Sequence, residues 1–194
     1  FLDVGQGDCS LIETPDGKKI LIDGGGVEGR RTGEVAGVKK DVVGAKVVVP
    51  FLHRKGINYL DMVILTHPHA DHLGGLIRVL EEIKVGEVLD SGQDYDSQAY
   101  KRFKALIEAN KIKYSAAQAG QTITFEEKLK GYILNPSYPF IGDTNSDSIV
   151  MRLVYGNIAF MFTGDLEREG EERVLSSKFQ VLGSTVLKVG HHGS

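Results

Sequence analysis

The sequence predicts an α/β sandwich, because its 194 residues fall into three stretches with different patterns. The first third is rich in short strand patterns, the middle third alternates strands with helices, and the last third returns to strands. Such an order places helices on the faces of β-sheets. At roughly 150 residues per domain, the length predicts one domain over residues 1–194.

The N-terminal stretch is expected to contain a β-hairpin. Its strand patterns cover Phe1–Val4, Asp8–Glu13 and Lys19–Asp23. A turn over residues 14–18 separates the last two, because its proline presets φ and its glycine accepts a positive φ. Three glycines at positions 24–26 then end the regular structure.

The middle third shows the alternation of strands with helices most clearly. Apolar residues at helical spacing predict the helix Leu73–Lys84, and Ser97 is a plausible N-cap for the next helix. The expected helices are Asp41–Lys55, Leu73–Lys84 and Ser97–Ala109, and the expected strands are Asp61–Thr66 and Gly86–Asp90.

The last third is predicted to be mostly β-structure. A glycine-containing two-residue turn at Gly156-Asn157 predicts a hairpin. The helix Glu167–Ser177 interrupts the strands, which are Lys111–Ala116, Thr122–Phe125, Leu129–Leu134, Ser148–Tyr155, Ile158–Thr163 and Thr185–Val189.

Composition excludes several classes of protein. Hydrophobic residues make up 41% and charged residues 25%, a globular balance that excludes disordered and fibrous chains. No apolar run is long enough for a transmembrane helix, and no basic-then-apolar leader is visible. The single cysteine, Cys9, cannot form an internal disulfide, and we interpret it as a small core residue.

Charge is nearly balanced but unevenly distributed. The net charge of −3 argues against a protein that coats nucleic acid. Between residues 30 and 55, however, basic residues outnumber acidic ones, and Arg30 and Arg31 are adjacent. Such a stretch could steer a polyanion, or it could be an ordinary solvated surface, and composition leaves both readings open.

The strongest chemical signal is the segment Thr66-His67-Pro68-His69-Ala70-Asp71-His72. It follows a buried strand and precedes a helix, which is where α/β folds place their sites. Four of its seven residues can ligate a metal, and imidazole with carboxylate suits zinc, manganese or iron. We therefore expect a metal site here, because clustered histidines in a loop are costly to bury without a ligand.

Three other positions carry weaker signals, each with an ordinary alternative. Asp165 ends a strand and could bridge two metals, or it could cap the following helix. The pair His191-His192 follows another apolar strand and could ligate a metal or be solvated. Asp23 could start a turn, or it could accept a hydrogen bond from a ligand histidine and fix its tautomer.

The motif H-x-H-x-D-H at positions 67–72 resembles the metallo-β-lactamase superfamily. Four further segments narrow the resemblance to the hydrolase domain of ComEC-type DNA-uptake (competence) proteins, and phosphorylcholine-esterase-like proteins share them. The segments are F-L-D-V-G-Q-G-D at 1–8, L-I-D-G-G at 21–25, F-T-G-D at 162–165 and L-K-V-G-H-H-G-S at 187–194.

The resemblance implies a four-layer αββα sandwich that holds two divalent metal ions, zinc or manganese. It also implies that the family continues beyond Ser194 to a late histidine, so we expect the C-terminal strands and the last ligand motif to be missing. Carried over by position, the resemblance implies that one metal is bound by His67, His69 and His191 and the other by Asp71 and His72, with Asp165 bridging the two. It also implies that Asp71 and Asp165 are the catalytic carboxylates. The side chains that support the ligands would be those of Asp23 and His192.

The function implied is hydrolysis of phosphodiesters by hydroxide generated at the two metals, most simply by a nuclease for single-stranded DNA. Arg30 and Arg31 would contact the DNA, and Tyr95, Tyr100, Tyr138 or Phe140 could stack on bases. The parent protein would be a membrane channel with this domain on its extracytoplasmic face. No G-x-x-x-x-G-K loop is present, so we expect no nucleotide cofactor. A hydrolase for small esters or lactams and a metal-poor docking domain remain the alternatives.

Overall fold

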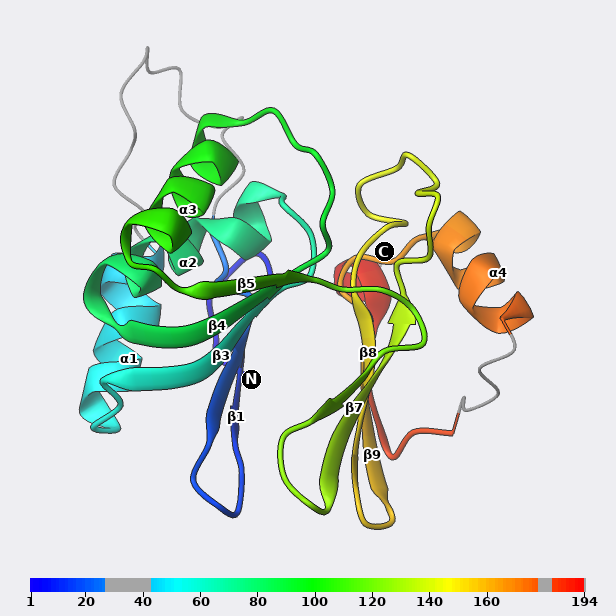
Figure 1. Cartoon of the computed structure of the whole chain (residues 1–194), viewed down its shortest axis with the longest axis horizontal. Helices are drawn as coiled ribbons and strands as arrows, with labels where there is room; N and C mark the ends of the chain where they lie inside the picture. The colour runs from blue at the N-terminus through cyan, green and yellow to red at the C-terminus, as the bar shows by residue number, and fades with distance from the viewer. Residues whose placement is uncertain (27–42, 178–182, 194) are drawn as a thin grey trace. The chain divides into compact units, whose positions relative to one another are not determined.

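The computed structural model describes residues 1–26, 43–177 and 183–193, which form two compact units. Unit 1 comprises Phe1–Leu89 and Asp94–Ser115, and unit 2 comprises Asp90–Gln93 and Ala116–Ser194. Each unit is built on a five-stranded β-sheet with helices, as Figure 1 shows. The predicted α/β class is therefore confirmed.

The sheet of unit 1 has the order β1-β2-β3-β4-β5. The predicted hairpin is confirmed, since β1 and β2 pair antiparallel, and β2 then pairs parallel with β3. The strands are β1 (Ser10–Glu13), β2 (Lys19–Ile22), β3 (Tyr59–Leu65), β4 (Lys84–Asp90) and β5 (Lys113–Ala116).

The prediction of a strand over Phe1–Val4 is wrong. These residues form no ladder, and the N–H of Leu2 donates to the carbonyl of Cys9 at 2.9 Å. Gly5 and Gly7 follow with φ values of 78° and 88°, a left-handed conformation that glycine adopts at little cost. The two glycines bend the chain here, so the apolar alternation of the first residues does not produce a strand.

Among its described residues, unit 1 has the α-helices α1, α2 and α3, and Figure 1 shows α2 and α3 on the same side of its sheet. A π-helical turn (Gly44–Val48) leads into α1 (Val49–Arg54), while α2 spans Ala70–Glu82 and α3 spans Gln98–Ala109. The predicted cap of α3 is confirmed, because the Ser97 hydroxyl accepts from the Tyr100 N–H at 3.1 Å. Helix α2 starts three residues before the predicted Leu73, so Asp71 and His72 lie in its first turn.

The core of unit 1 lies between β3 and the helices. Leu60, Val63 and Leu65 of β3 are fully buried, and so are Leu73 of α2 and Phe103 of α3. The end of β3 is therefore rigidly packed, and the segment that follows it starts from a fixed position.

Backbone-to-backbone packing fastens the glycine segment after β2 to helix α2. The N–H of Gly24 donates to the His72 carbonyl at 2.8 Å, and the N–H of Gly75 donates to the Gly25 carbonyl at 2.9 Å. A Cβ atom on Gly75 would lie 2.0 Å from the Gly24 carbonyl oxygen, so only glycine permits this approach. The contact fixes the position of Asp23, the residue just before this segment, relative to His72.

Unit 2 has a sheet with the order β10-β9-β8-β7-β6. The predicted hairpin at residues 156–157 is confirmed by the pairing of Tyr155 with Ile158, and β10 runs parallel to β9. The strands are β6 (Thr122–Thr124), β7 (Leu129–Asn135), β8 (Val150–Tyr155), β9 (Ile158–Phe162) and β10 (Val186–Lys188).

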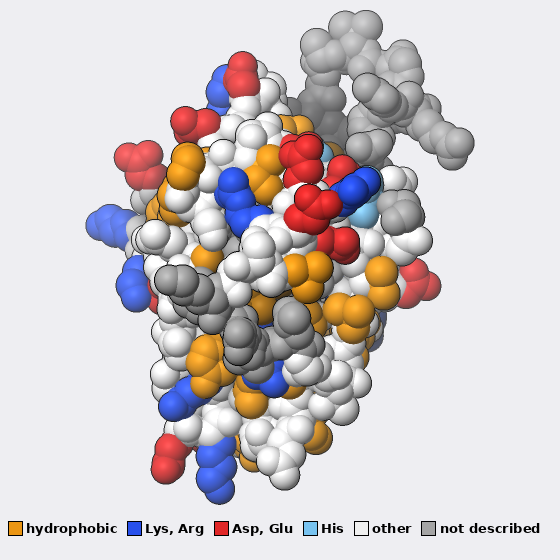
Figure 2. All heavy atoms as spheres, turned by 90° about the vertical axis from the view of Figure 1, so that its right-hand side faces the viewer, with side chains coloured by type: hydrophobic (Ala, Val, Ile, Leu, Met, Phe, Trp, Pro, Cys, Tyr) orange, Lys and Arg blue, Asp and Glu red, His pale blue; other side chains and the backbone are white. Residues whose placement is uncertain are grey.

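Helix α4 (Arg168–Ser176) packs on this second sheet. Val174 and the preceding Leu166 join an apolar cluster with Leu134, Val150 and Met161 of the strands. The other side of α4 is exposed and charged. Figure 2 faces this side and shows acidic and basic side chains close together. Among the residues that the structure describes, no helix is long and apolar enough to cross a membrane.

Candidate metal centre

The H-x-H-x-D-H segment runs from the end of β3 into the first turn of α2. His69 is the N-cap of α2, and its carbonyl accepts from the N–H groups of His72 and Leu73 at 3.1 and 2.9 Å. His67 and His72 are completely buried, and Asp71 is 6% exposed. The start of the helix thus brings two buried imidazoles and the half-buried ring of His69 together within unit 1.

His67 and His69 direct ring nitrogens toward each other. Nε2 of His67 lies 3.1 Å from Nδ1 of His69, and the two rings meet edge to face. In a tetrahedral zinc site with Zn–N bonds of about 2.0–2.1 Å, two ligand nitrogens are about 3.3 Å apart. This pair of nitrogens therefore fits one divalent ion without a large movement of either ring.

Asp23 accepts three hydrogen bonds beneath these histidines. Its Oδ1 accepts from the backbone N–H of Thr66 at 2.8 Å, and its Oδ2 accepts from the Thr66 hydroxyl at 2.8 Å. Nδ1 of His72 lies 2.9 Å from the same Oδ2. Of the two readings of Asp23, the structure therefore shows the carboxylate that holds a histidine.

These bonds determine which ring nitrogens remain for a metal. The Thr66 hydroxyl gives its proton to Asp23, so it accepts from Nδ1 of His67, which lies 3.2 Å away. His72 likewise donates its Nδ1 proton to Asp23. A proton on Nδ1 leaves Nε2 with its lone pair, which is the form of histidine that binds a metal. Both histidines could thus bind a metal through Nε2.

Asp23 itself is held in an unusual environment. Burial raises the pKa of its carboxyl group, while the adjacent His72 acts in the opposite direction. Its φ of 57° is left-handed, although it is not glycine. Strained backbone of this kind persists where the surroundings determine it strongly, and it is typical of functional sites.

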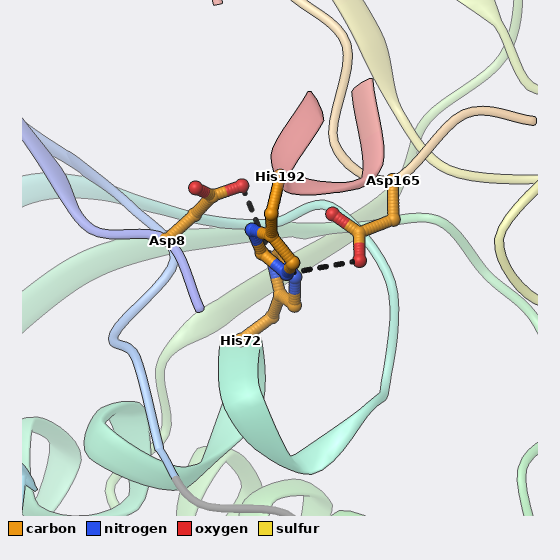
Figure 3. A group of neighbouring side chains, drawn as sticks. All are labelled: Asp8, His72, Asp165 and His192. Atoms are coloured by element: carbon orange, nitrogen blue, oxygen red, sulfur yellow. Dashed lines mark ion pairs between the residues drawn. The ribbon is translucent and has the colours of Figure 1, made fainter. Parts of the chain in front are cut away.

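Asp8 is a neighbour of the site that sequence reasoning missed. Its Oδ2 lies 3.9 Å from Nδ1 of His72, and Figure 3 shows the two side chains facing each other. In the structure, Asp8 directly follows Gly7, whose φ is positive, and a Cβ at Gly7 would lie 1.8 Å from the Asp71 carbonyl oxygen. That close approach brings the Asp8 segment against the start of α2.

Unit 2 places Asp165 next to His192. Nε2 of His192 lies 3.3 Å from Oδ2 of Asp165, as the dashed line in Figure 3 marks. The side chains follow neighbouring parallel strands, Asp165 after β9 and His192 after β10. Asp165 is 3% exposed, so a buried carboxylate faces an imidazole at this edge of the sheet.

Two reciprocal hydrogen bonds join the ends of these strands. The Thr163 hydroxyl donates to the Lys188 carbonyl at 2.8 Å, and Nζ of Lys188 donates to the Gly164 carbonyl at 2.9 Å. Lys188 Nζ also lies 3.9 Å from Oδ1 of Asp165. Sequence reasoning did not single out Lys188, because the contact joins segments that are distant in the sequence.

His191 has a different partner from His192. Its Nδ1 lies 3.0 Å from Oε1 of Glu167, the N-cap residue of α4. Because Glu167 occupies the N-cap, the alternative reading of Asp165 as the cap of this helix is wrong. His191 and His192 have left-handed φ values of 43° and 53°, a second place where non-glycine residues are strained beside candidate ligands.

The predicted site residues thus fall into two groups, each within one unit. Asp23, His67, His69, Asp71 and His72 belong to unit 1, while Asp165, His191 and His192 belong to unit 2. Arg30 and Arg31, predicted to contact substrate, lie outside the described residues.

A protein-family model with the description "Metallo-beta-lactamase superfamily" matches residues 2–194. ComE operon protein 3 of Bacillus subtilis is 33% identical over 100% of this chain and 25% of its own length. Competence protein ComA of Neisseria gonorrhoeae is 30% identical over 99% of this chain and 23% of its own length. The chain spans about a quarter of the length of these curated relatives.

Solved structures share the fold at low sequence identity. The metallo-beta-lactamase fold protein YhfI of Bacillus subtilis superposes with a TM-score of 0.52, 18% identity and coverage of 82% of this chain and 55% of its own. The Flv1 flavodiiron core of Synechocystis sp. PCC6803 gives a TM-score of 0.51, 16% identity and coverage of 81% and 33%. At these identities the likeness shows the fold alone, and it agrees with the predicted fold.

Proposed function

The chain belongs to the metallo-beta-lactamase superfamily, and from this premise we propose that it is a metal-dependent phosphodiesterase that cleaves single-stranded DNA. Members of the superfamily are metal-dependent hydrolases. The curated relatives include a competence protein and a ComE operon protein, which supports a role in DNA uptake. We further propose that the domain belongs to a membrane protein and acts on its extracytoplasmic face.

One observation carries the metal part of the proposal. Asp23 orients His72 directly and His67 through Thr66, so that both rings present Nε2. Carboxylate and hydroxyl groups that hold ligand histidines in this way are typical of metal sites. A packing role alone would not require two buried imidazoles whose tautomers are fixed by neighbouring oxygens.

The proposed ligand set follows the resemblance to the family. His67 and His69 would bind the first ion, Asp71 and His72 the second, and Asp165 would bridge them, as the resemblance implies. One histidine of the pair 191–192 would complete the first site. The 3.3 Å contact with Asp165 favours His192, and the pairing with Glu167 makes His191 the second choice. We propose zinc or manganese as the metals, since both accept these ligands.

Two bound cations would lower the pKa of water and withdraw charge from the phosphoryl oxygens. Other residues of the chain would orient the ligands and balance their charge. Asp23 and Thr66 hold the rings of His67 and His72. Lys188 holds the Gly164 carbonyl and lies beside Asp165, where it offsets part of the carboxylate charge.

A hydrolysis assay with matched histidine variants tests the proposal. The full chain would be given a labelled single-stranded oligonucleotide, the corresponding duplex and bis(p-nitrophenyl) phosphate, each with added manganese or zinc. We expect metal-dependent cleavage, lost by at least about 100-fold in His69→Ala because the metal is misplaced. His53→Ala is the control, since His53 is exposed on α1. Absence of cleavage of every diester by protein that contains metal would contradict the proposal.

A further inference from the structure

The four aromatic residues that could stack on bases have different surroundings in the structure. Tyr100 is 7% exposed and stacks on Phe103, so its faces are not available to a ligand. Tyr138 and Phe140 contact each other, with ring centroids 4.6 Å apart. Tyr95 is half-buried, and its ring lies 5.7 Å from the ring of His69 at an interplanar angle of 70°. Tyr95 therefore borders the candidate metal centre within unit 1.

Tyr95 is also held in a defined position. The buried ring of Tyr100 lies 6.5 Å from the Tyr95 ring at an interplanar angle of 81°. The Tyr95 carbonyl accepts from the N–H of Ser97 at 3.1 Å, and the Ser97 hydroxyl caps α3. The aromatic contacts and the helix cap together fix the loop, so the ring is ordered before any ligand arrives, which lowers the entropy cost of stacking on it.

The charge beside the ring is partly cancelled. Asp96 follows Tyr95 and is exposed, and a polyanion would be repelled by it if it were unpaired. Lys101 of α3 forms an ion pair with Asp96 and lowers the pKa of its carboxyl group. A phosphodiester chain can therefore approach the ring with less repulsion than the sequence Asp94-Tyr95-Asp96 indicates.

We propose that Tyr95 is a stacking platform for one nucleobase of a single-stranded substrate, next to His69. This inference rests on the proposed function and adds a means of substrate selection to it. Every base has a π-face, so stacking on tyrosine tolerates any sequence, whereas bases inside a duplex are already stacked and paired. Tyr95 thus accounts for a preference for single strands without reading the sequence.

Binding to paired oligonucleotides with and without bases tests this inference. Phosphorothioate dT12 and a phosphorothioate of the same length with abasic sugars would be titrated in the presence of manganese and followed by fluorescence anisotropy. We expect the wild type to bind the base-containing strand more tightly by about 5-fold to 100-fold, the range measured for loss of one stacked base. Tyr95→Leu, which keeps apolar bulk against His69 and Tyr100, should lose this preference.

Two further variants separate stacking from packing. Tyr95→Phe keeps the ring and should keep the preference. Tyr59→Leu is the matched control, because Tyr59 is 50% exposed at the start of β3, whereas His67 and His69 follow its end. Hydrolysis of bis(p-nitrophenyl) phosphate by Tyr95→Leu, compared with its binding of the two strands, reports whether the metal centre is intact.

The outcomes distinguish failure of the stacking role of Tyr95 from failure of the proposed phosphodiesterase function. A wild type that binds both strands equally, or a Tyr95→Leu variant that retains the preference, would overturn the role of Tyr95. Equal loss of small-diester hydrolysis and of DNA binding in Tyr95→Leu would show that the residue only positions His69. If the wild type hydrolyses no diester and binds neither strand, the proposed function fails as well.

Discussion

Asp23 and His72 share a hydrogen bond of 2.9 Å between Oδ2 and Nδ1, in the interior of unit 1. The same oxygen accepts from Thr66, whose hydroxyl contacts His67. One carboxylate therefore orients two imidazoles, and the glycine segment that follows it is fastened to α2 by two backbone hydrogen bonds. Hydrogen bonds within the protein therefore set the orientation of both rings.

Asp23→Asn should weaken metal binding while the protein stays folded. The amide replaces one acceptor oxygen by a donor, so it cannot accept from Thr66 and His72 as the carboxylate does. Loss of such a supporting group typically costs about 10-fold to 100-fold in metal affinity. Competition with a chromogenic chelator would measure the change for zinc and manganese. Asp16→Asn, in the exposed turn between β1 and β2, is the control, and an unchanged affinity in Asp23→Asn would show that the carboxylate does not prepare the ligands.

Gly75→Ala should destabilise the protein, although alanine inside a helix is normally favourable by about 1 kcal/mol. The added Cβ would meet the Gly24 carbonyl oxygen at 2.0 Å, and both groups are backbone held by hydrogen bonds. Overpacking of this kind costs about 1–3 kcal/mol or more. Urea denaturation would measure the change, with Gly183→Ala as the control because no atom lies within 4 Å of its added Cβ. Increased stability of Gly75→Ala would mean that the two segments separate easily.

Lys188→Met should lower the free energy of unfolding by about 1.5–3 kcal/mol, the usual value for a hydrogen bond from a charged donor. The Lys188 side chain is 13% exposed, and its ammonium group donates to the Gly164 carbonyl and lies beside Asp165. Lys130→Met on β7 removes an exposed lysine from the same sheet and should change little. Chemical denaturation of both variants provides the comparison, and equal stabilities would show that the Lys188 contact contributes nothing.

Cys9 should be inert toward thiol reagents in the native protein. Its side chain is 3% exposed, and burial raises the pKa of the thiol above its ordinary value. The reactive species is the thiolate, so a raised pKa means that less of it is present at pH 8 than for a free cysteine. Ellman's reagent should therefore react with the denatured chain and only slowly with the native one. Rapid reaction of the native protein would place Cys9 at an accessible position.

The local parts of the site could be predicted from the sequence. The H-x-H-x-D-H segment directly follows a buried strand, as expected, and Ser97 caps α3. The start of α2 at Ala70 was missed because Ala70-Asp71-His72 carries no apolar periodicity, even though the chain is already helical there.

Contacts between distant segments could not be predicted in the same way. Asp8 approaches His72 because Gly5 and Gly7 bend the chain, and this bend also prevents a strand at Phe1–Val4. Tyr95 meets His69 because the core fixes both the end of β3 and the start of α3. The periodicity of apolar residues shows which face of a single helix or strand is buried. It contains no information about which loops come into contact in the folded chain.

The path of the chain between the two units limits how the protein can be dissected. It passes from one unit to the other after residues 89, 93 and 115, so neither unit is a continuous stretch. A recombinant fragment that ends at residue 89 would lack Tyr100, Phe103 and Ile107 of α3, which fill the core of unit 1. Chimeras with homologous proteins would therefore have to exchange residues 94–115 together with the N-terminal segment to keep that core complementary.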